Sequence, residues 1–161
     1  MTKTVIRPIK ANEVPLLTDF LYEAIFQPQK GNKVPRTILQ CPEIWAYVDR
    51  FGTHPGDMCH VALSDGVIVG AIWSRLGCSY GKIDDATPEL AISVYPEYRG
   101  KGLGSKLMDF HLVKLENNGC KQISLSVDKA NYAVDMYRKF GFEIICEREH
   151  DYLMVKRLGN K

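Results

Sequence analysis

Residues 89–104 read E-L-A-I-S-V-Y-P-E-Y-R-G-K-G-L-G, and this stretch decides the fold. Its order predicts an apolar strand (Leu90 to Val94), a break at Pro96, a basic turn rich in glycine, and then a helix. The alternating glycines lack the Cβ atoms that keep a ligand away from the backbone. The first turn of a helix offers unpaired N–H groups and the positive end of a dipole. The stretch therefore predicts a phosphate site at the start of a helix.

Two familiar phosphate-binding turns do not match this spacing. A P-loop requires a Gly-Lys-Ser/Thr run, which is missing from this turn. The dinucleotide fingerprint G-x-G-x-x-G stands in the first strand-turn-helix unit of its fold. Here the spacing is G-x-G-x-G, and three predicted strands precede it. A purely structural turn stays open as an alternative, but it leaves the flanking Arg99 and Lys101 unexplained.

Length and composition predict one globular domain spanning residues 1–161. The hydrophobic share is 45%, the charged share is 25%, and the formal net charge is +2. A dedicated nucleic-acid binder is usually more basic, with clustered Lys and Arg, so no nucleic-acid partner is expected. The five cysteines form no C-x-x-C pair, so neither a disulfide framework nor a metal site is expected.

The stretch from Met1 to Lys10 is polar and mixed, so no signal peptide is expected, and no run approaches the ~20 apolar residues of a membrane helix. A cytoplasmic location without a membrane partner is the resulting expectation.

The remaining chain alternates between strand and helix patterns. Ser64-Asp65-Gly66 between two apolar runs predicts a hairpin. Besides the strand and helix of the opening stretch, strands are predicted at 4–9, 58–63, 67–74, 122–127, 142–146 and 152–158, and helices at 12–26, 42–51 and 131–140. The 27–41 stretch, with two prolines and a glycine, predicts a loop. This order predicts an α/β protein of the mixed α+β kind, with one sheet covered by helices.

The turn also matches the pattern R/Q-x-x-G-x-G/A at residues 99–104, and after an apolar strand this resembles the general N-acetyltransferase superfamily (GNAT). Asn131-x-Ala133-x-x-x-Tyr137-x-x-x-Gly141-Phe142 resembles the second signature of that superfamily, and the opening Ile6-Arg7-Pro8-Ile9 resembles its first strand. The resemblance covers nearly the whole chain. It implies a central mixed, mostly antiparallel sheet with a V-shaped splay between strands 4 and 5, flanked by helices.

The resemblance implies acetyl-CoA as the cofactor and acetyl donor, with no metal. Its pyrophosphate is expected on the glycine turn, made of Arg99, Gly100, Lys101, Gly102, Leu103, Gly104 and Ser105. The pantetheine arm is expected along the backbone of Ile92, Ser93 and Val94, with a hydrogen bond from Asn131. A helix N-cap is the structural alternative for Asn131. Lys139, with Arg138, is expected near the nucleotide phosphates unless it is a solvated surface charge.

Two catalytic roles follow from the resemblance. Tyr137 is expected to donate a proton to the departing thiolate, although its place on an apolar stripe also suits core packing. Glu89 is the candidate base, directly or through water, if burial raises its pKa; a structural strand-end carboxylate is the alternative. His111 is expected to be a packed residue, while His60 stays open as a group facing the active side of the sheet. The expected mechanism is direct transfer to an amine in a ternary complex, without a covalent cysteine intermediate.

The acceptor is the least determined part. The sequence favours a small-molecule primary amine, because the chain carries no added recognition module. Candidate aromatic walls are Phe26, Trp45, Tyr47, Trp73 and Tyr80, with core packing as the alternative for the two tryptophans. A non-catalytic acyl-CoA-binding regulatory module and a protein amine acetyltransferase are the alternative functions. A homodimer using the strands between residues 142 and 158 is expected by resemblance.

Overall fold

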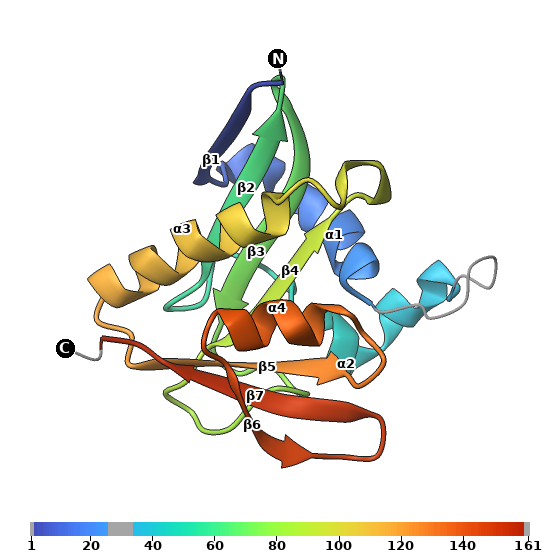
Figure 1. The fold of residues 1–161 in the computed structure, drawn as a ribbon. Helices are drawn as coiled ribbons and strands as arrows, with labels where there is room; N and C mark the ends of the chain where they lie inside the picture. Colours follow the sequence, from blue (N-terminus) through green and yellow to red (C-terminus); the bar gives the residue numbers. More distant parts are fainter. Residues whose placement is uncertain (1, 26–33, 160–161) are drawn as a thin grey trace.

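The structure, a computed structural model, describes residues 2–25 and 34–159. Within them, seven strands form one sheet in the order β1-β2-β3-β4-β5-β7-β6 (Figure 1). The strands are β1 (Thr4–Pro8), β2 (Met58–Ser64), β3 (Val67–Arg75), β4 (Glu89–Val94), β5 (Gln122–Asp128), β6 (Glu143–Glu147) and β7 (Asp151–Arg157). All neighbours pair antiparallel except β4 and β5, which pair parallel. The predicted mixed, mostly antiparallel sheet is therefore confirmed.

The parallel pair β4–β5 is the weak point of the sheet. It holds a single register pair, Glu89 with Ser124, whereas β3 and β4 pair from Gly70 and Val94 to Arg75 and Glu89. Beyond that one pair the two strands run apart, as Figure 1 shows. This divergence is the V-shaped splay that the sequence predicted, and it leaves one edge of β4 open.

Helices cover both faces of the sheet (Figure 1). Helices α3 (Leu103–Asn117) and α4 (Ala133–Lys139) pack against one core, and α1 (Leu17–Ala24) and α2 (Pro42–Trp45) lie against the other. Consecutive residues of a strand point to opposite faces, so Ala71 and Trp73 of β3 enter the second core while Ile72 enters the first. Burial on both faces explains the long apolar runs of β2 and β3.

Three predicted elements differ from the structure. The helix expected over 12–26 is a 3-10 helix (Ala11–Leu16) followed by α1, because Pro15 lacks the N–H for an unbroken α-helical ladder. A further 3-10 helix (Arg36–Gln40) stands within the expected loop. The helix expected over 42–51 covers only Pro42–Trp45, and turns follow up to Arg50, whose φ is +48°. Within the described ranges, no helix is long and apolar enough to cross a membrane.

Candidate active site

A pocket of about 320 Å³ lies where β4 and β5 separate. Helix α1 and the 44–47 segment close one side, and the start of α4 closes the other. Its lining residues are Leu21, Ala24, Ile25, Ile44, Tyr47, Tyr80, Glu89, Leu90, Ala91, Ile92, Ser126, Val127, Asp128, Asn131 and Tyr137. Glu89 and Tyr137, the two predicted catalytic residues, thus border one pocket although they come from different elements.

The glycine turn lies between β4 and α3. Gly100 and Gly102 have φ values of +76° and +81°, a backbone conformation that other residues rarely adopt. Gly102 stands at the N-cap position of α3, and a Cβ on either glycine would meet no atom within 4 Å. Among the described residues, no backbone carbonyl accepts a hydrogen bond from the amides of residues 100–105. The turn therefore offers a row of free N–H donors at the positive end of a 15-residue helix, which suits a phosphate.

The two basic side chains of the turn, Arg99 and Lys101, contact other groups of the protein. Arg99 turns back toward β4: its Nε donates to the carbonyl oxygen of Val94 at 2.7 Å, and its Nη2 lies 3.2 Å from Oε1 of Glu23. Lys101 lies over the ring of Tyr98. Lys101 and Leu103 border a separate hollow of about 460 Å³ beside the β2–β3 hairpin. The expected phosphate contacts of this turn accordingly rest on backbone amides, with Arg99 fixing the shape of the turn.

Glu89 is a buried carboxylate with an incomplete set of partners. Its residue exposure is 3%, and the hydroxyl of Tyr47 donates a hydrogen bond to its Oε2. Its Oε1 has no hydrogen-bond partner among the described residues. Burial raises the pKa of Glu89 to about 7, and hydrogen bonds from Tyr47 and from the Gly81 backbone, with the charge of Arg148, oppose the rise. A carboxyl group with this pKa can exchange a proton near neutral pH.

Gly81 makes room for this carboxylate. A Cβ on Gly81 would lie 2.7 Å from Cδ and Oε2 of Glu89, a distance that real Cβ atoms do not show. Gly81 is also tied to β5, because its carbonyl accepts a hydrogen bond of 2.6 Å from the Ser124 hydroxyl. Glycine is therefore required here for space, since its backbone angles are ordinary.

Tyr137 enters the pocket from α4. Its ring packs edge to face against Phe142, with centroids 5.8 Å apart, and the residue is 9% exposed. Burial raises the pKa of the phenol far above its ordinary value, so the hydroxyl keeps its proton. Tyr137 belongs to a core cluster and also lines the pocket, so its packing role is confirmed and its role as proton donor stays a prediction.

The other predicted cofactor residues divide between the pocket and its surroundings. Asn131 lines the pocket, and its Oδ1 accepts a hydrogen bond of 2.8 Å from the amide of Ala133, the first residue of α4, although the N-cap position of that helix is Tyr132. Ile92 lines the pocket as well. Ser93 instead points to the opposite face, where its hydroxyl donates to the Phe20 carbonyl at 2.6 Å. Val94 is buried, and Lys139 is exposed at the end of α4.

The candidate aromatic walls reduce to two tyrosines. Tyr47 and Tyr80 line the pocket, whereas Trp73 is 1% exposed in the core and Trp45 is not among the lining residues. Phe26 lies outside the described residues.

His60 does not face the pocket. Its Nδ1 lies 2.7 Å from Nδ1 of His111 on α3, on the other side of the sheet, and Nε2 of His111 lies 2.9 Å from the Ser74 hydroxyl. The sequence-based possibility of an active-side His60 was wrong, and packing of His111 is confirmed at 0% exposure. Among the described residues, no group of three or more His, Cys, Asp or Glu could hold a metal ion.

Sequence reasoning missed the residues that complete the environment of Glu89. Tyr47 was expected only as an aromatic wall, and neither Gly81 nor Ser126 was given a role of its own. Ser126 stands on β5 and lines the pocket, and its side chain lowers the pKa of Tyr47, against the larger effect of burial. These residues belong to no short motif, because they meet only when the 44–47 segment, the 76–88 loop and β5 come together in the fold.

Comparisons with known proteins agree with this arrangement. Residues 21–142 match the model of the "Acetyltransferase (GNAT) family". A mycothiol acetyltransferase from Thermobispora bispora is 37% identical over 79 residues, which cover 48% of this chain and 27% of that protein. A thialysine N-epsilon-acetyltransferase from Bos taurus is 39% identical over 59 residues, which cover 36% of this chain and 35% of that protein. The matched segments thus span only about a quarter to a third of these two relatives.

A solved structure extends the likeness to the whole fold. The PaiA N-acetyltransferase from Thermoplasma acidophilum, in complex with coenzyme A, superposes with a TM-score of 0.71 over 96% of this chain and 99% of that chain. The sequence identity is 19%, so this likeness establishes the shared fold alone.

Proposed function

The chain belongs to the acetyltransferase (GNAT) family, and from this premise we propose that it transfers an acetyl group from acetyl-CoA to a primary amine in a ternary complex. The observation that carries the proposal is the single pocket in the β4–β5 gap, which Glu89 and Tyr137 border together. A carboxyl group with a pKa of about 7 and a phenol that keeps its proton are a base and an acid for one reaction.

The chain offers acetyl-CoA a place along β4 and the glycine turn. The free amides of residues 100–105 would hold the pyrophosphate, with the α3 dipole adding to their field. The open edge of β4 from Ala91 to Val94 would hold the pantetheine arm as an added strand does. Asn131 borders the same gap, and its amide nitrogen could donate to the arm while its Oδ1 accepts a hydrogen bond from the Ala133 amide. Lys139, at the exposed end of α4, is proposed near the nucleotide phosphates.

The proposed reaction needs three contributions from the protein. Glu89 takes up the proton that the acceptor nitrogen loses as the new C–N bond forms. A backbone N–H of the 92–94 stretch polarises the carbonyl that is attacked. Tyr137 donates its proton to the sulfur as the C–S bond breaks, and exchange with solvent restores both side chains. The thioester supplies the activated acetyl group, so no covalent enzyme intermediate is required.

We propose a small molecule as the acceptor. Ile25, Ile44, Tyr47 and Tyr80 line the same pocket as Glu89, and we assign them to the acceptor. Two relatives carry small-molecule names, a mycothiol acetyltransferase and a thialysine N-epsilon-acetyltransferase. A protein amine acetyltransferase is the second candidate, favoured by the 29% identity over 103 residues with an N-alpha-acetyltransferase 50 from Danio rerio.

A non-catalytic module that senses acyl-CoA is the alternative from another class. Such a module would use the glycine turn and Asn131 and would have no need for a proton donor or acceptor in the gap. Tyr137 and Glu89 therefore separate the two functions. The proposed enzyme is expected in the cytoplasm, as a homodimer, with neither nucleic acid nor membrane as a partner.

Calorimetric titration of the protein with acetyl-CoA tests the proposal, with NAD and ATP as controls and Gly102→Glu as the matched variant. Selective binding of acetyl-CoA that the added side chain and charge abolish is the expected result. A panel of primary amines, read out by release of free CoA, then tests transfer and identifies the acceptor class. Binding without transfer to any amine would favour the sensing module, and the absence of acetyl-CoA binding would remove the proposal.

A further inference from the structure

The carboxylate of Glu89 borders the pocket but is nearly closed off from solvent. Its Oε2 already accepts the hydrogen bond from Tyr47, and its Oε1 is buried out of contact with solvent. The Gly81 backbone lies against the same carboxyl group, so the carboxylate cannot swing toward that loop. A group that touches both the pocket and Oε2 is therefore placed to pass a proton to Glu89.

Tyr47 is that group. Its hydroxyl contacts Oε2 of Glu89, and both residues line the pocket. Ser126 of β5 lines the same pocket, and its side chain lowers the pKa of the Tyr47 hydroxyl, against the effect of burial. A hydroxyl can accept one proton while it donates another, which a carboxylate or an ammonium cannot do alone.

We propose that Tyr47 relays the acceptor's proton to Glu89 and is itself a catalytic residue of the site. The inference rests on the proposed acetyl transfer. The nitrogen of the attacking amine forms its bond to the acetyl carbon, and one N–H bond breaks as its proton moves to the Tyr47 oxygen. The Tyr47 O–H bond breaks in the same event, and that proton forms an O–H bond with Oε2 of Glu89. Tyrosine ends neutral, and the carboxylate becomes a carboxylic acid.

A phenolate intermediate is not required, and burial disfavours one. Burial and the charge of Glu89 both raise the pKa of Tyr47 far above its ordinary value. The Tyr47 phenol therefore stays neutral while it relays the proton, and Glu89 is the final proton acceptor.

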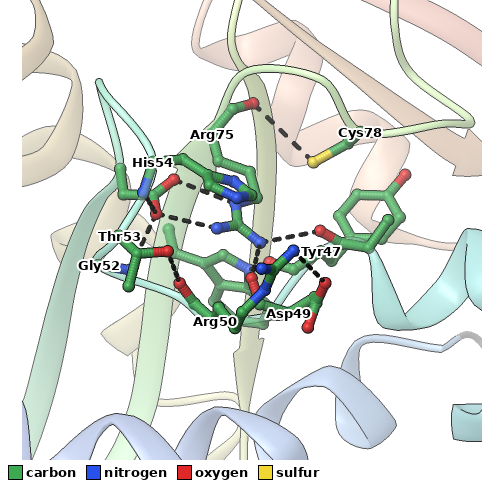
Figure 2. A network of polar contacts seen from close by, with 11 residues as sticks. Tyr47, Asp49, Arg50, Gly52, Thr53, His54, Arg75 and Cys78 are labelled. Carbon is green, nitrogen blue, oxygen red and sulfur yellow. Dashed lines mark hydrogen bonds and ion pairs between the residues drawn. The ribbon is translucent and has the colours of Figure 1, made fainter.

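The backbone on both sides of Tyr47 is clamped in place. Nε1 of Trp73 donates to the Tyr47 carbonyl at 3.0 Å. Nη1 of Arg75 donates to the carbonyls of Ala46 and Asp49 at 3.0 Å and 2.8 Å (Figure 2). Both donors come from β3, the neighbour of β4 in the sheet, so the relay hydroxyl and its carboxylate are held by adjacent strands. This precision is what proton transfer between two fixed oxygens requires.

The test uses Tyr47→Phe, which keeps the ring and removes only the hydroxyl, with Tyr152→Phe on β7 as a matched control. The substrates are acetyl-CoA and the amine from a panel of primary amines that gives the wild type its fastest CoA release. We expect Tyr47→Phe to lower kcat/KM by about 10²-fold with acetyl-CoA affinity unchanged, and the control to keep wild-type rates. Glu89→Gln should lose as much, and the double variant should lose no more, because both act in one transfer.

A second readout separates a relay from mere packing. The infrared band of the protonated Glu89 carboxyl, identified by its loss in Glu89→Gln, should titrate in the wild type with a midpoint near pH 7. The Tyr47 hydrogen bond favours the carboxylate, so Tyr47→Phe should move that midpoint upward by roughly one pH unit. The rising limb of kcat/KM with pH should move in the same direction.

Several outcomes would overturn the relay. Full activity of Tyr47→Phe would do so, as would losses that multiply in the double variant or an unmoved infrared midpoint. If Tyr47→Phe does not fold, Ser126→Ala replaces it: a decrease in kcat/KM of about tenfold is expected, and wild-type rates would count against the relay. A wild type that binds no acetyl-CoA, or acetylates no amine, instead overturns the proposed function.

Discussion

Tyr137 is a residue whose packing and chemistry can be separated by experiment. Tyr137→Phe keeps the ring against Phe142 and removes the proposed proton donor. Turnover should fall by about 10²-fold while acetyl-CoA affinity stays the same, as steady-state rates and calorimetry would measure. Tyr132→Phe is the matched control, because that tyrosine is 74% exposed and outside the pocket lining. Wild-type turnover in Tyr137→Phe would leave the thiolate without its proposed acid.

Gly81 gives a prediction about space. Gly81→Ala places a methyl group 2.7 Å from the carboxyl of Glu89, so either the loop or the carboxyl must move. We expect a loss of about 1–3 kcal/mol in the free energy of unfolding, measured by urea denaturation, with a large loss of turnover. The same change in a Glu89→Ala background should cost much less, because the clash is gone. Equal costs in both backgrounds would contradict the contact.

At this scale the sequence predicted the residues that belong to motifs and missed those that do not. Glu89 and Tyr137 stand at fixed positions relative to a strand and a second signature, so their meeting in one pocket was expected. The hydrogen bond from Tyr47 and the space left by Gly81 depend on loops that approach β4 from far along the chain. No spacing rule in the sequence encodes such an approach.

Among the elements, the 46–57 segment is held to β3 by one buried ion pair. Arg75 and Asp57 have side-chain exposures of 1% and 2%, and Nη2 lies 2.9 Å from Oδ2 (Figure 2). Asp57 also accepts hydrogen bonds from the amides of Gly52 and His54, so its charge is fully partnered. The pair fastens a stretch that has little regular structure of its own.

Asp57→Asn should therefore destabilise the fold by about 3–5 kcal/mol, because it leaves the buried Arg75 without its counter-charge. Chemical denaturation measures the loss. Asp49→Asn is the control: its carboxylate lies 3.5 Å from the exposed Arg50, and a surface pair of this kind contributes less than about 1 kcal/mol. Similar stabilities for the two variants would show that the buried pair is dispensable.

The His60–His111 pair between β2 and α3 predicts a pH dependence of stability. Burial lowers the pKa of His60 to about 4 and that of His111 to about 3. Unfolding frees both rings to titrate near 6.5, so the unfolded chain binds more protons below that pH. Their contribution is complete above pH 6.5 and is lost as the pH falls toward the folded values.

At pH 5 the loss from His111 alone is about 2 kcal/mol, by the relation between pKa and free energy. Glu89 acts in the opposite direction, because burial raises its pKa, so the measurement belongs in a Glu89→Gln background. Urea denaturation at pH 7 and pH 5 should show a decrease that His111→Gln reduces and that replacement of the exposed His150 by Gln does not. A pH-independent stability in that background would refute the neutral buried pair.

The element boundaries that were wrong share a cause. Pro15 and the 46–51 turns lie in apolar stretches with helical spacing, yet their backbone hydrogen bonds end early. Hydrophobic periodicity shows which face of a helix is buried. It does not show where the helical backbone hydrogen bonds end. The strands were predicted more closely, because both faces of β2 and β3 are buried and Asp65-Gly66 marks their turn.

For the whole molecule, the gap between β4 and β5 predicts a global effect of the proposed cofactor. Acetyl-CoA at one hundred times its dissociation constant should stabilise the protein by about 2.7 kcal/mol. Hydrogen exchange should slow at the amides of residues 91–94 and 100–105, with ATP at equal concentration as the control. Protection confined to other segments would mean that the ligand binds elsewhere.

The homodimer stays a prediction at this scale. The last two strands, β6 and β7, lie at one end of the sheet, and Ile145 of β6 is 54% exposed. Light scattering of the purified protein should give twice the 18.2 kDa chain mass. The mass of a single chain would contradict the predicted homodimer and would leave the proposed reaction unaffected.

The architecture was largely predictable because the glycine turn, the second signature and the strand order constrain one another along the whole chain. The acceptor was not, since its end of the pocket is assembled from the α1 end, the 44–47 segment and the 76–88 loop. The side chains that line this end suit one particular acceptor, so they follow no general sequence motif. Phe26, which was predicted as an aromatic wall, lies outside the described residues.

The position of β7 has a consequence for how the protein is made. Strands β1 to β4 neighbour one another in chain order, but β7 is inserted between β5 and β6. During synthesis the first four strands can pair as they emerge, whereas β5 and β6 must wait for β7 before either gains its antiparallel partner. A chain that stops short of Asp151 would leave β6 without a partner and β5 with only its short pairing to β4. We expect such truncated copies to be prone to aggregation, because their strand edges stay unpaired until the final strand joins the sheet.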